Sequence, residues 1–326
     1  MLNVAVIGIG NISLLFDHNK DDTSRCLSHI KAIYTNNHFT LKYIVDIEDK
    51  NITKVKNFFP NVKYFNNYKL LIDKNDIDIL VISTPTSSHF DILEYFKNSS
   101  IQLFFVEKPL FNSFNDYKNL DSFFKDKLLI NYTRRFDKSI QKLKKKIKNK
   151  ILQNPKKIII NYCKGLKNNG SHMIDLLNFL FVNNTIKDIN ILSSSIGFND
   201  DDLCYDLFIQ MTYEGKIIPI YFISHDYTKY NLIEFNIYFE NKFVKYLNSK
   251  NQIEYFDIID DKNYPTYKVF SDDFKISKLN DKTIFYDVYN YIYKLLNHNV
   301  SNISSFDDEL KNINFIEKIK GRACQN

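Results

Sequence analysis

The chain has 326 residues, with 44 Lys and Arg against 38 Asp and Glu, which gives a net charge of +6. Hydrophobic residues make up 44% and aromatic residues 15%, so the composition excludes a disordered chain and favours two packed domains over one. No apolar run approaches the roughly 20 residues that a membrane-spanning helix needs, and the beginning MLNVAVIGIGN has the pattern of a strand rather than a signal peptide. We therefore expect a cytoplasmic protein without a membrane partner.

The cysteines and the basic residues indicate neither a metal site nor a nucleic-acid partner. Cys26, Cys163, Cys204 and Cys324 are far apart and form no CxxC pair, which predicts reduced thiols rather than a disulfide framework or a zinc site. The densest basic run is 142–150. Because no nucleic-acid motif accompanies it, we interpret this run as the solvated face of a helix.

Short apolar runs alternate with helical patterns in the first third of the chain. The runs are 2–7, 40–45, 77–82 and 101–106, and the helical stretches between them are 24–36, 48–58 and 86–97. Buried parallel strands have this composition, and strands that alternate with helices form right-handed βαβ units. The pattern predicts an α/β fold, a Rossmann doubly wound parallel sheet, in an N-terminal domain over 1–120.

The pattern changes in the remainder of the chain, 121–326. Helices are expected at 136–150, 171–181, 282–297 and 305–320, strands at 157–162, 186–195, 203–213, 216–225, 231–240 and 242–248, and turns near 167–170, 198–202 and 258–266. Long strands without intervening helices predict an α+β domain with a large open, mostly antiparallel sheet.

The segment VIGIGNIS (6–13) directly follows the first strand. Gly8 allows a tight turn, and Gly10 lets the backbone approach a pyrophosphate, while a helix that opens at Asn11 and Ile12 would direct its N–H groups at the phosphates. The third position of this fingerprint is Ser13 rather than Gly. A plain strand-to-helix turn therefore remains the alternative to a cofactor site.

Asp46 ends the second strand, where an acid can bind the ribose hydroxyls of NAD and repel the 2′-phosphate of NADP. It lies 38 positions after Gly8, against a usual spacing of about 20. We interpret 16–23 as a polar insertion that accounts for the difference. The alternative for Asp46 is a helix N-cap.

Three further segments carry a family resemblance: STPTSSH (83–89), VEKPL (106–110) and KGLKNNGSHMIDLL (164–177). With the phosphate loop, in this order, they resemble the Gfo/Idh/MocA family of NAD(P)-dependent sugar and cyclitol oxidoreductases over nearly the whole chain. The resemblance implies an active site between a Rossmann domain and a second domain that binds substrate. It also implies a homodimer or homotetramer that pairs through the open sheet, with strands at 221–243 as the candidate surface unless helices of the same chain cover them.

The resemblance assigns roles to residues of these segments. Thr84, Pro85 and His89 match positions that line the cofactor near the nicotinamide. In the Glu-Lys-Pro signature, Lys108 would reach the substrate hydroxyl, and Glu107 would shape the cofactor side. In addition, His172 matches the catalytic histidine, and Arg135 matches an arginine that follows the sixth strand and would contact substrate.

These residue types suit the oxidation of a secondary alcohol. His172 has an ordinary pKa near neutrality and could take the hydroxyl proton, while Lys108 could polarise the oxygen. Pro109 could fix Lys108 through a cis peptide. Asp175, three residues after His172, could orient it or bind substrate; a His-x-x-Asp metal pair lacks an evident third ligand, so no metal is expected. The alternatives are a structural histidine and a surface lysine.

One position departs from the family pattern. Many members have Asp four residues before the histidine, where this chain has Asn168. Because an amide is neither an acid nor a base, the proton relay would rest on His172 and Lys108. Some nucleotide-sugar 3-dehydrogenases of the family have Asn there, which favours a nucleotide sugar of surface-glycan synthesis as substrate. A cyclitol or free-sugar dehydrogenase and a non-catalytic NAD-binding regulator remain alternatives.

Overall fold

The computed structural model describes residues 1–17, 21–197 and 202–323, and these form two compact units. Unit 1 comprises Met1–Phe136 and Asp281–Leu310, and unit 2 comprises Asp137–Asn280 and Lys311–Asn326. The first unit thus continues past residue 120, the expected end of the N-terminal domain, and takes in a segment near the C-terminus. Cys324 and most of the turn expected at 198–202 lie outside the described residues.

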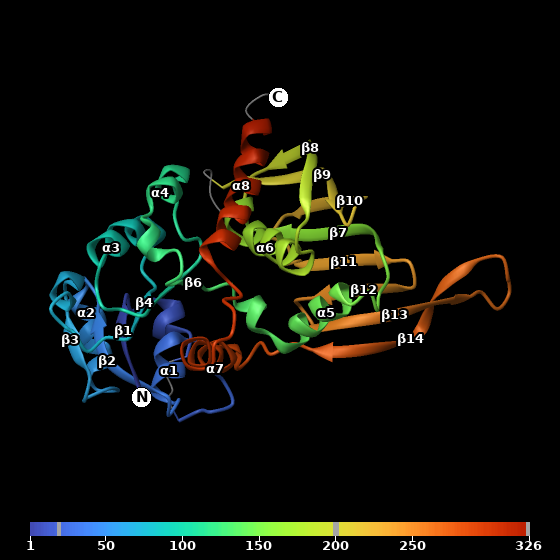
Figure 1. The fold of residues 1–326 in the computed structure, drawn as a ribbon. Coiled ribbons are helices and arrows are strands. Elements are labelled where there is room, and N and C mark those ends of the chain that lie inside the picture. Colours follow the sequence, from blue (N-terminus) through green and yellow to red (C-terminus); the bar gives the residue numbers. More distant parts are fainter. Residues whose placement is uncertain (18–20, 198–201, 324–326) are drawn as a thin grey trace. The chain divides into compact units, whose positions relative to one another are not determined.

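Unit 1 is built on a six-stranded parallel sheet (Figure 1). Its strands are β1 (Leu2–Ile7), β2 (Phe39–Val45), β3 (Lys63–Phe65), β4 (Ile79–Ile82), β5 (Leu103–Val106) and β6 (Leu128–Ile130). They lie in the order β3-β2-β1-β4-β5-β6 and pair in parallel throughout. This order confirms the predicted doubly wound Rossmann sheet. The short strands β3 and β6 are additions to the four predicted ones.

Helices of unit 1 cover the sheet. They are α1 (His29–Tyr34), α2 (Asp49–Lys56), α3 (His89–Tyr95), α4 (Phe114–Asn119) and α7 (Ile284–Asn297), with short 3-10 turns at Tyr68–Leu71, Ser122–Phe124 and Thr133–Phe136. Although α7 is distant in sequence, it packs beside α1 (Figure 1). Its side chains Val288, Tyr289 and Ile292 are fully buried in the core of unit 1.

The chain after Gly10 has a shorter helix than the expected helical stretch at 24–36. A single π-helical turn spans Asn11–Leu15, and α1 begins at His29. The intervening insertion is tied to α1 by the buried ion pair between Lys31 Nζ and Asp17 Oδ1, which are 2.8 Å apart. Because the insertion interrupts the helix, the first turn after the phosphate loop stands alone.

Unit 2 contains an eight-stranded sheet. Its strands are β7 (Pro155–Cys163), β8 (Thr185–Ser195), β9 (Cys204–Tyr213), β10 (Lys216–His225), β11 (Glu234–Phe239), β12 (Lys242–Leu247), β13 (Gln252–Asp260) and β14 (Lys268–Lys278). They lie in the order β14-β13-β12-β11-β7-β10-β9-β8. Strands β7 and β10 pair in parallel, and the other neighbours pair antiparallel. The predicted mostly antiparallel sheet is confirmed.

The prediction of a turn at 258–266 is wrong for 258–260, which belong to a strand. Strand β13 continues to Asp260, and a hairpin leads into β14; the two strands together extend beyond the rest of the sheet (Figure 1). Most side chains of β14 are exposed. A strand without a buried face has no apolar alternation to reveal it.

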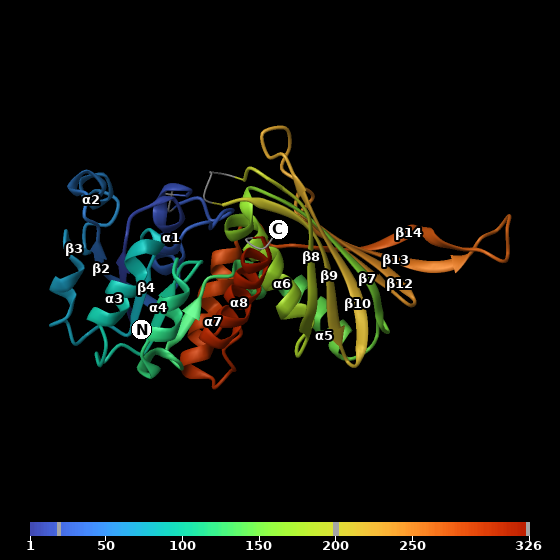
Figure 2. The same cartoon turned by 90° about the horizontal axis from the view of Figure 1, so that it is seen from above.

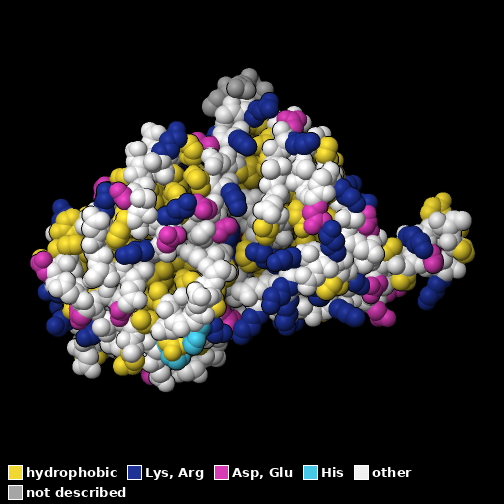
Figure 3. All heavy atoms as spheres, viewed as in Figure 1, with side chains coloured by type: hydrophobic (Ala, Val, Ile, Leu, Met, Phe, Trp, Pro, Cys, Tyr) yellow, Lys and Arg dark blue, Asp and Glu magenta, His cyan; other side chains and the backbone are white. Residues whose placement is uncertain are grey.

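Helices α5 (Lys138–Lys148), α6 (Ser171–Leu180) and the second part of α8 (Phe306–Ala323) lie on one face of this sheet (Figure 2). Ile140, Leu143 and Ile147 bury the apolar side of α5, and its lysines gather on the surface (Figure 3). This arrangement agrees with the expected solvated helix face. In the described residues, no helix is both long enough and apolar enough to span a bilayer.

Candidate cofactor and active site

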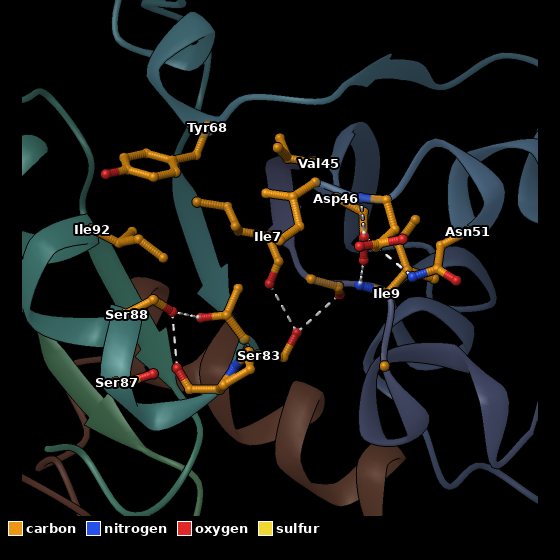
Figure 4. A pocket seen from close by; sticks show the side chains of 16 residues that line it. Ile7, Ile9, Val45, Asp46, Asn51, Tyr68, Ser83, Ser87, Ser88 and Ile92 are labelled. Carbon is orange, nitrogen blue, oxygen red and sulfur yellow. Dashed lines mark hydrogen bonds between the residues drawn. The ribbon is translucent and has the colours of Figure 1, made fainter. Parts of the chain in front are cut away.

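A cavity of about 500 Å³ opens at the carboxyl ends of β1, β2 and β4 (Figure 4). The chain order reverses between β1 and β4, and doubly wound sheets bind ligands at such a reversal. The predicted residues Gly8, Gly10, Asp46, Thr84 and Pro85 all line this cavity. Its other lining residues are Ile7, Ile9, Val45, Ile47, Glu48, Asn51, Tyr68, Ser83, Ser87, Ser88 and Ile92.

The two glycines of the phosphate loop differ in what surrounds them. Gly8 has φ +96°, and a Cβ there would lie 2.9 Å from the carbonyl oxygen of Ser83, so the turn excludes a side chain. A Cβ on Gly10 would meet nothing within 4 Å. The open space beside Gly10 is where a ligand could approach the backbone, whereas Gly8 serves the fold.

Asp46 holds the phosphate loop from the neighbouring strand. Its Oδ2 accepts a hydrogen bond from the Ile9 N–H at 2.6 Å, and its Oδ1 accepts from Glu48 N–H at 2.9 Å and from Asn51 Nδ2 at 3.2 Å. The residue is 9% exposed. The carboxylate is thus fixed at the cavity wall, with Glu48 as a second acid beside it.

The segment after β4 is a 3-10 turn, Thr86–Ser88, that leads into α3. Ser88 Oγ donates to Thr84 Oγ1 at 2.7 Å, which shapes the cavity wall. His89 is fully buried, and its Nε2 and Nδ1 lie 2.9 Å from Thr84 O and 3.0 Å from Leu110 O. Burial lowers the pKa of His89 despite these two carbonyls. The structure therefore places His89 behind the cavity wall, where it links the loops of Thr84 and Leu110. It is not among the residues that line the cavity, although the motif predicted that it lines the cofactor.

The Glu-Lys-Pro segment follows β5, at the same edge of the sheet. Glu107 Oε1 accepts hydrogen bonds from His29 Nε2 at 2.8 Å and Asn131 Nδ2 at 2.5 Å. Burial raises the pKa of Glu107, but the bonds from His29 and Asn131 and the nearby charge of Lys108 outweigh it and lower the pKa overall. The Lys108–Pro109 peptide is cis. Sequence reasoning missed His29, which belongs to no motif.

In unit 2, the predicted histidine follows a loop that is shaped by an acid. The loop is a π-helical turn, Gly165–Gly170, which continues into α6. Asp202 accepts from Lys167 N–H at 2.7 Å and from Asn168 N–H at 2.9 Å. Gly165 has φ +88°, and a Cβ on it would collide with the Asp202 carboxylate. Asp202 thereby fixes the backbone of Asn168 and the entry to α6.

Two residues expected to bind substrate are packed inside their own units instead. Asp175 is 1% exposed and accepts from Asn312 Nδ2 at 2.8 Å. Arg135 is 2% exposed, and its guanidinium lies 3.0 Å from Asp308 Oδ2 and 2.6 Å from the Ile303 carbonyl oxygen. Buried charges need such partners. His172 itself is half-buried in the first turn of α6.

A polar cluster at the carboxyl ends of β7 and β10 was also missed. His225 Nε2 lies 2.9 Å from Asn161 Oδ1, and Tyr230 OH lies 3.4 Å from His225 Nδ1. Strand β7 runs directly into the loop that carries Asn168. These residues are far apart in sequence, so only the parallel pairing of the two strands brings them together.

The residues of unit 1 fit an NAD molecule. The open side of Gly10 can receive a pyrophosphate, the fixed Asp46 carboxylate can accept hydrogen bonds from ribose hydroxyls, and apolar cavity walls can cover the ring systems. Asn11 and Ile12 open the turn beside Gly10, but they do not line the cavity.

Residues 2–132 match the model of an oxidoreductase family with an NAD-binding Rossmann fold, GFO_IDH_MocA. No curated protein matches the sequence. Among solved structures, the chain is similar in fold to the dehydrogenase MviM from Clostridium difficile, with 14% identity, 98% of this chain and 99% of that chain covered, and a TM-score of 0.71.

Two other solved structures share the fold. One is the super-repressor mutant of Gal80p from Saccharomyces cerevisiae, with 13% identity, 98% and 95% coverage of this chain and that chain, and a TM-score of 0.73. The other is the UDP-N-acetylglucosamine 3-dehydrogenase GnnA from Acidithiobacillus ferrooxidans, with 12% identity, 97% and 96% coverage, and a TM-score of 0.69. The family match confirms the resemblance and the cofactor inferred from the motifs. Residues 2–132 therefore match the NAD-binding Rossmann domain of the Gfo/Idh/MocA oxidoreductase family, and this match supports an NAD(P)-dependent oxidoreductase.

Proposed function

We propose that the protein transfers a hydride between NAD and the carbon of a secondary hydroxyl on a nucleotide-linked sugar, in surface-glycan synthesis. The observation that carries the proposal is the position of Lys108. It follows β5 at the sheet edge where Asp46 and Thr84 line the cofactor cavity. A lysine at this edge can reach a substrate that lies against the nicotinamide.

In the proposed chemistry, His172 and Lys108 have different roles. NAD supplies the hydride acceptor when it is bound. His172 takes the hydroxyl proton as the carbon gives up its hydride, and the alcohol becomes a ketone. The Lys108 ammonium donates a hydrogen bond to the oxygen and stabilises its developing negative charge. In the reverse direction, His172 returns the proton.

Features of unit 2 support a sugar as the substrate. Asn168 stands on a loop held by Asp202. Asn161 lies near the end of β7, which runs into this loop, and His225 ends the neighbouring strand β10. Amide and imidazole groups can donate to and accept from sugar hydroxyls. The fold likeness to a UDP-N-acetylglucosamine 3-dehydrogenase favours the nucleotide-linked class over a free cyclitol.

We further propose that the protein forms a homo-oligomer through the sheet of unit 2. Aromatic side chains stack in rows across it, including Tyr238 with Phe243 and Phe256 with Phe274. Phe270 and Phe274 are 45% and 42% exposed. Exposed apolar rows of this kind serve interfaces. Sedimentation of the wild type against Phe274→Glu tests this, with a smaller species expected for the variant.

The test of the function is a turnover assay with NAD and a panel of nucleotide sugars, free sugars and cyclitols. Turnover of UDP-N-acetylglucosamine or another nucleotide sugar by the wild type, lost in Lys108→Ala and His172→Ala while NADH binding persists, would support the proposal. Turnover of a cyclitol alone would replace the substrate class. Because the fold also occurs in a repressor, bound NADH with no turnover on any panel member would favour a regulator.

A further inference from the structure

A buried chain of hydrogen bonds leads from the core of unit 1 to the Glu-Lys-Pro segment. Tyr289 OH lies 2.9 Å from His29 Nδ1, and His29 Nε2 lies 2.8 Å from Glu107 Oε1. Asn131 Nδ2 approaches the same carboxylate oxygen at 2.5 Å. His29 is 1% exposed and Tyr289 is fully buried. This series of hydrogen bonds ends at Glu107, one residue before Lys108.

The order of donors along this chain follows from chemistry. Burial raises the pKa of Tyr289 well above its ordinary value, so its hydroxyl keeps its proton and can donate to Nδ1. A neutral imidazole that accepts at Nδ1 carries its proton on Nε2, and this N–H then points at the Glu107 carboxylate. With the Tyr289 hydroxyl as donor to Nδ1, the Nε2 N–H of His29 faces Glu107.

The surroundings hold the ring in one orientation. The imidazole meets Phe105 and Phe285 edge to face, with ring centroids 5.1 Å and 4.9 Å away. Apolar packing of this kind gains nothing from a ring nitrogen, and a buried polar group costs stability unless it is paired. The contacts with Tyr289 and Glu107 are therefore what a histidine supplies here beyond a phenylalanine.

We propose that His29 is a positioning residue of the reaction: backed by Tyr289, it holds the ionised Glu107 carboxylate in one orientation and thereby fixes the backbone and the electrostatic surroundings of Lys108. The inference rests on the proposed function in so far as Lys108 acts on substrate. The two contacts of His29 on which the inference depends, with Tyr289 and with Glu107, both lie within unit 1.

Glu107 and Lys108 are coupled in two ways. They are adjacent in the chain, so a change in the backbone at Glu107 also moves Lys108. Their charges also interact, because the Lys108 ammonium helps to keep Glu107 ionised. On the other side of Pro109, the N–H of Leu110 is held by Glu309 Oε1 at 3.2 Å. The lysine thus lies between the largely buried Glu107 carboxylate, which His29 and Asn131 hold, and the backbone of Leu110, which the buried Glu309 carboxylate holds.

Three substitutions separate positioning from packing. His29→Phe keeps an aromatic ring but removes both nitrogens. His29→Gln can place an amide N–H near the site of Nε2 and so restore the donor to Glu107. Tyr289→Phe removes one hydroxyl and leaves the ring. The matched control is Tyr43→Phe, because Tyr43 is 3% exposed and its hydroxyl contacts Asp76 at 2.9 Å, outside this chain of hydrogen bonds.

The first readout needs no substrate. Lysine amines of the full-length protein, saturated with NADH, are dimethylated with ¹³C and observed by NMR, and the Lys108 signal is identified as the one missing in Lys108→Arg. We expect His29→Phe and Tyr289→Phe to move this signal, and His29→Gln and Tyr43→Phe to leave it near the wild-type position. Even if His29→Phe fails to fold, a wild-type Lys108 signal in Tyr289→Phe would overturn the inference, as would equal shifts in His29→Phe and His29→Gln.

The second readout is turnover with the sugar identified by the panel. His29→Phe is expected to lower kcat about 10- to 100-fold, with the dissociation constant of NADH changed less than about twofold, and His29→Gln to recover most of kcat. Unchanged kcat in a folded His29→Phe would contradict positioning. Retained turnover in Lys108→Ala would instead contradict the proposed function, and the NMR comparison would still decide the role of His29.

Discussion

The carboxylate of Asp46 accepts a hydrogen bond from the backbone N–H of Ile9 at 2.6 Å, between two residues 37 positions apart. Ile9 stands between Gly8 and Gly10, so the acid at the end of β2 holds the loop at the end of β1. The residue expected to choose between NAD and NADP therefore also shapes the loop expected to receive the pyrophosphate. If Asp46 selects the cofactor as proposed, the same side chain couples that selection to the geometry of the loop.

The first prediction concerns this carboxylate. Asp46→Asn removes the charge that repels a 2′-phosphate and weakens the acceptor for the ribose hydroxyls, so the dissociation constant of NADH should rise about tenfold. The preference for NADH over NADPH should shrink, as measured by fluorescence titration. Glu48→Gln, in the same cavity wall, is the control and should change the preference less. An unchanged ratio in Asp46→Asn would reject the role of Asp46.

The second prediction separates the two glycines of the loop. Gly10→Ala places a methyl group in open space, so we expect an unchanged unfolding temperature and weaker NADH binding. Gly8→Ala places one 2.9 Å from a backbone oxygen at positive φ, so the unfolding temperature should fall. Gly321→Ala, in α8 with nothing within 4 Å, is the control and should be neutral or slightly stabilising. Full NADH affinity in Gly10→Ala would show that no ligand approaches there.

A third prediction follows from the lowered pKa of His89. Because the folded pKa lies below the unfolded value of about 6.5, the unfolded chain takes up a proton first as the pH falls. The stability contributed by neutral His89 is thus complete above about pH 6.5 and is lost as the pH falls toward the folded pKa. The difference in unfolding temperature between wild type and His89→Gln should therefore be larger at pH 8 than at pH 5.5. A difference that grows on acidification would contradict this sign.

The fourth prediction tests how Asp202 supports the site in unit 2. Asp202→Ala leaves the N–H groups of Lys167 and Asn168 without the acceptor that holds them. We expect turnover to fall about tenfold or more, because a catalytic group displaced by about 1 Å can lose a hundredfold in rate. NADH binding should persist, since the cofactor cavity belongs to unit 1. Wild-type turnover would show that this loop does not position His172.

The sequence predicted most of the fold because its strongest signals are local. The apolar runs of β1, β2, β4 and β5 appear within a few residues of their observed bounds. Strands β3 and β6 have three residues each, too few for a periodic pattern, and β14 exposes most of its side chains. The sequence indicated the polar insertion at 16–23, but not that α1 begins only at His29, because that start depends on how the insertion packs.

The candidate site could be predicted where a motif fixes a backbone position. Gly8, Asp46 and Thr84 end their strands, and parallel strands bring those ends together. The motif gave no information on where a polar side chain finds its partners. His89 and Arg135 turn inward to carbonyls and a carboxylate, and His29 reaches Glu107 across 78 positions. Such partners become evident only once the strands and helices are assembled.

The most direct measurement is a titration of the purified chain with NADH and with NADPH, followed by nicotinamide fluorescence. The chain has no Trp, so the protein contributes little background. Our account predicts saturable binding of both wild type and Lys108→Ala to NADH, with a dissociation constant well below that for NADPH. A folded protein that binds neither nucleotide would contradict the central claim that the Rossmann domain binds NAD(H).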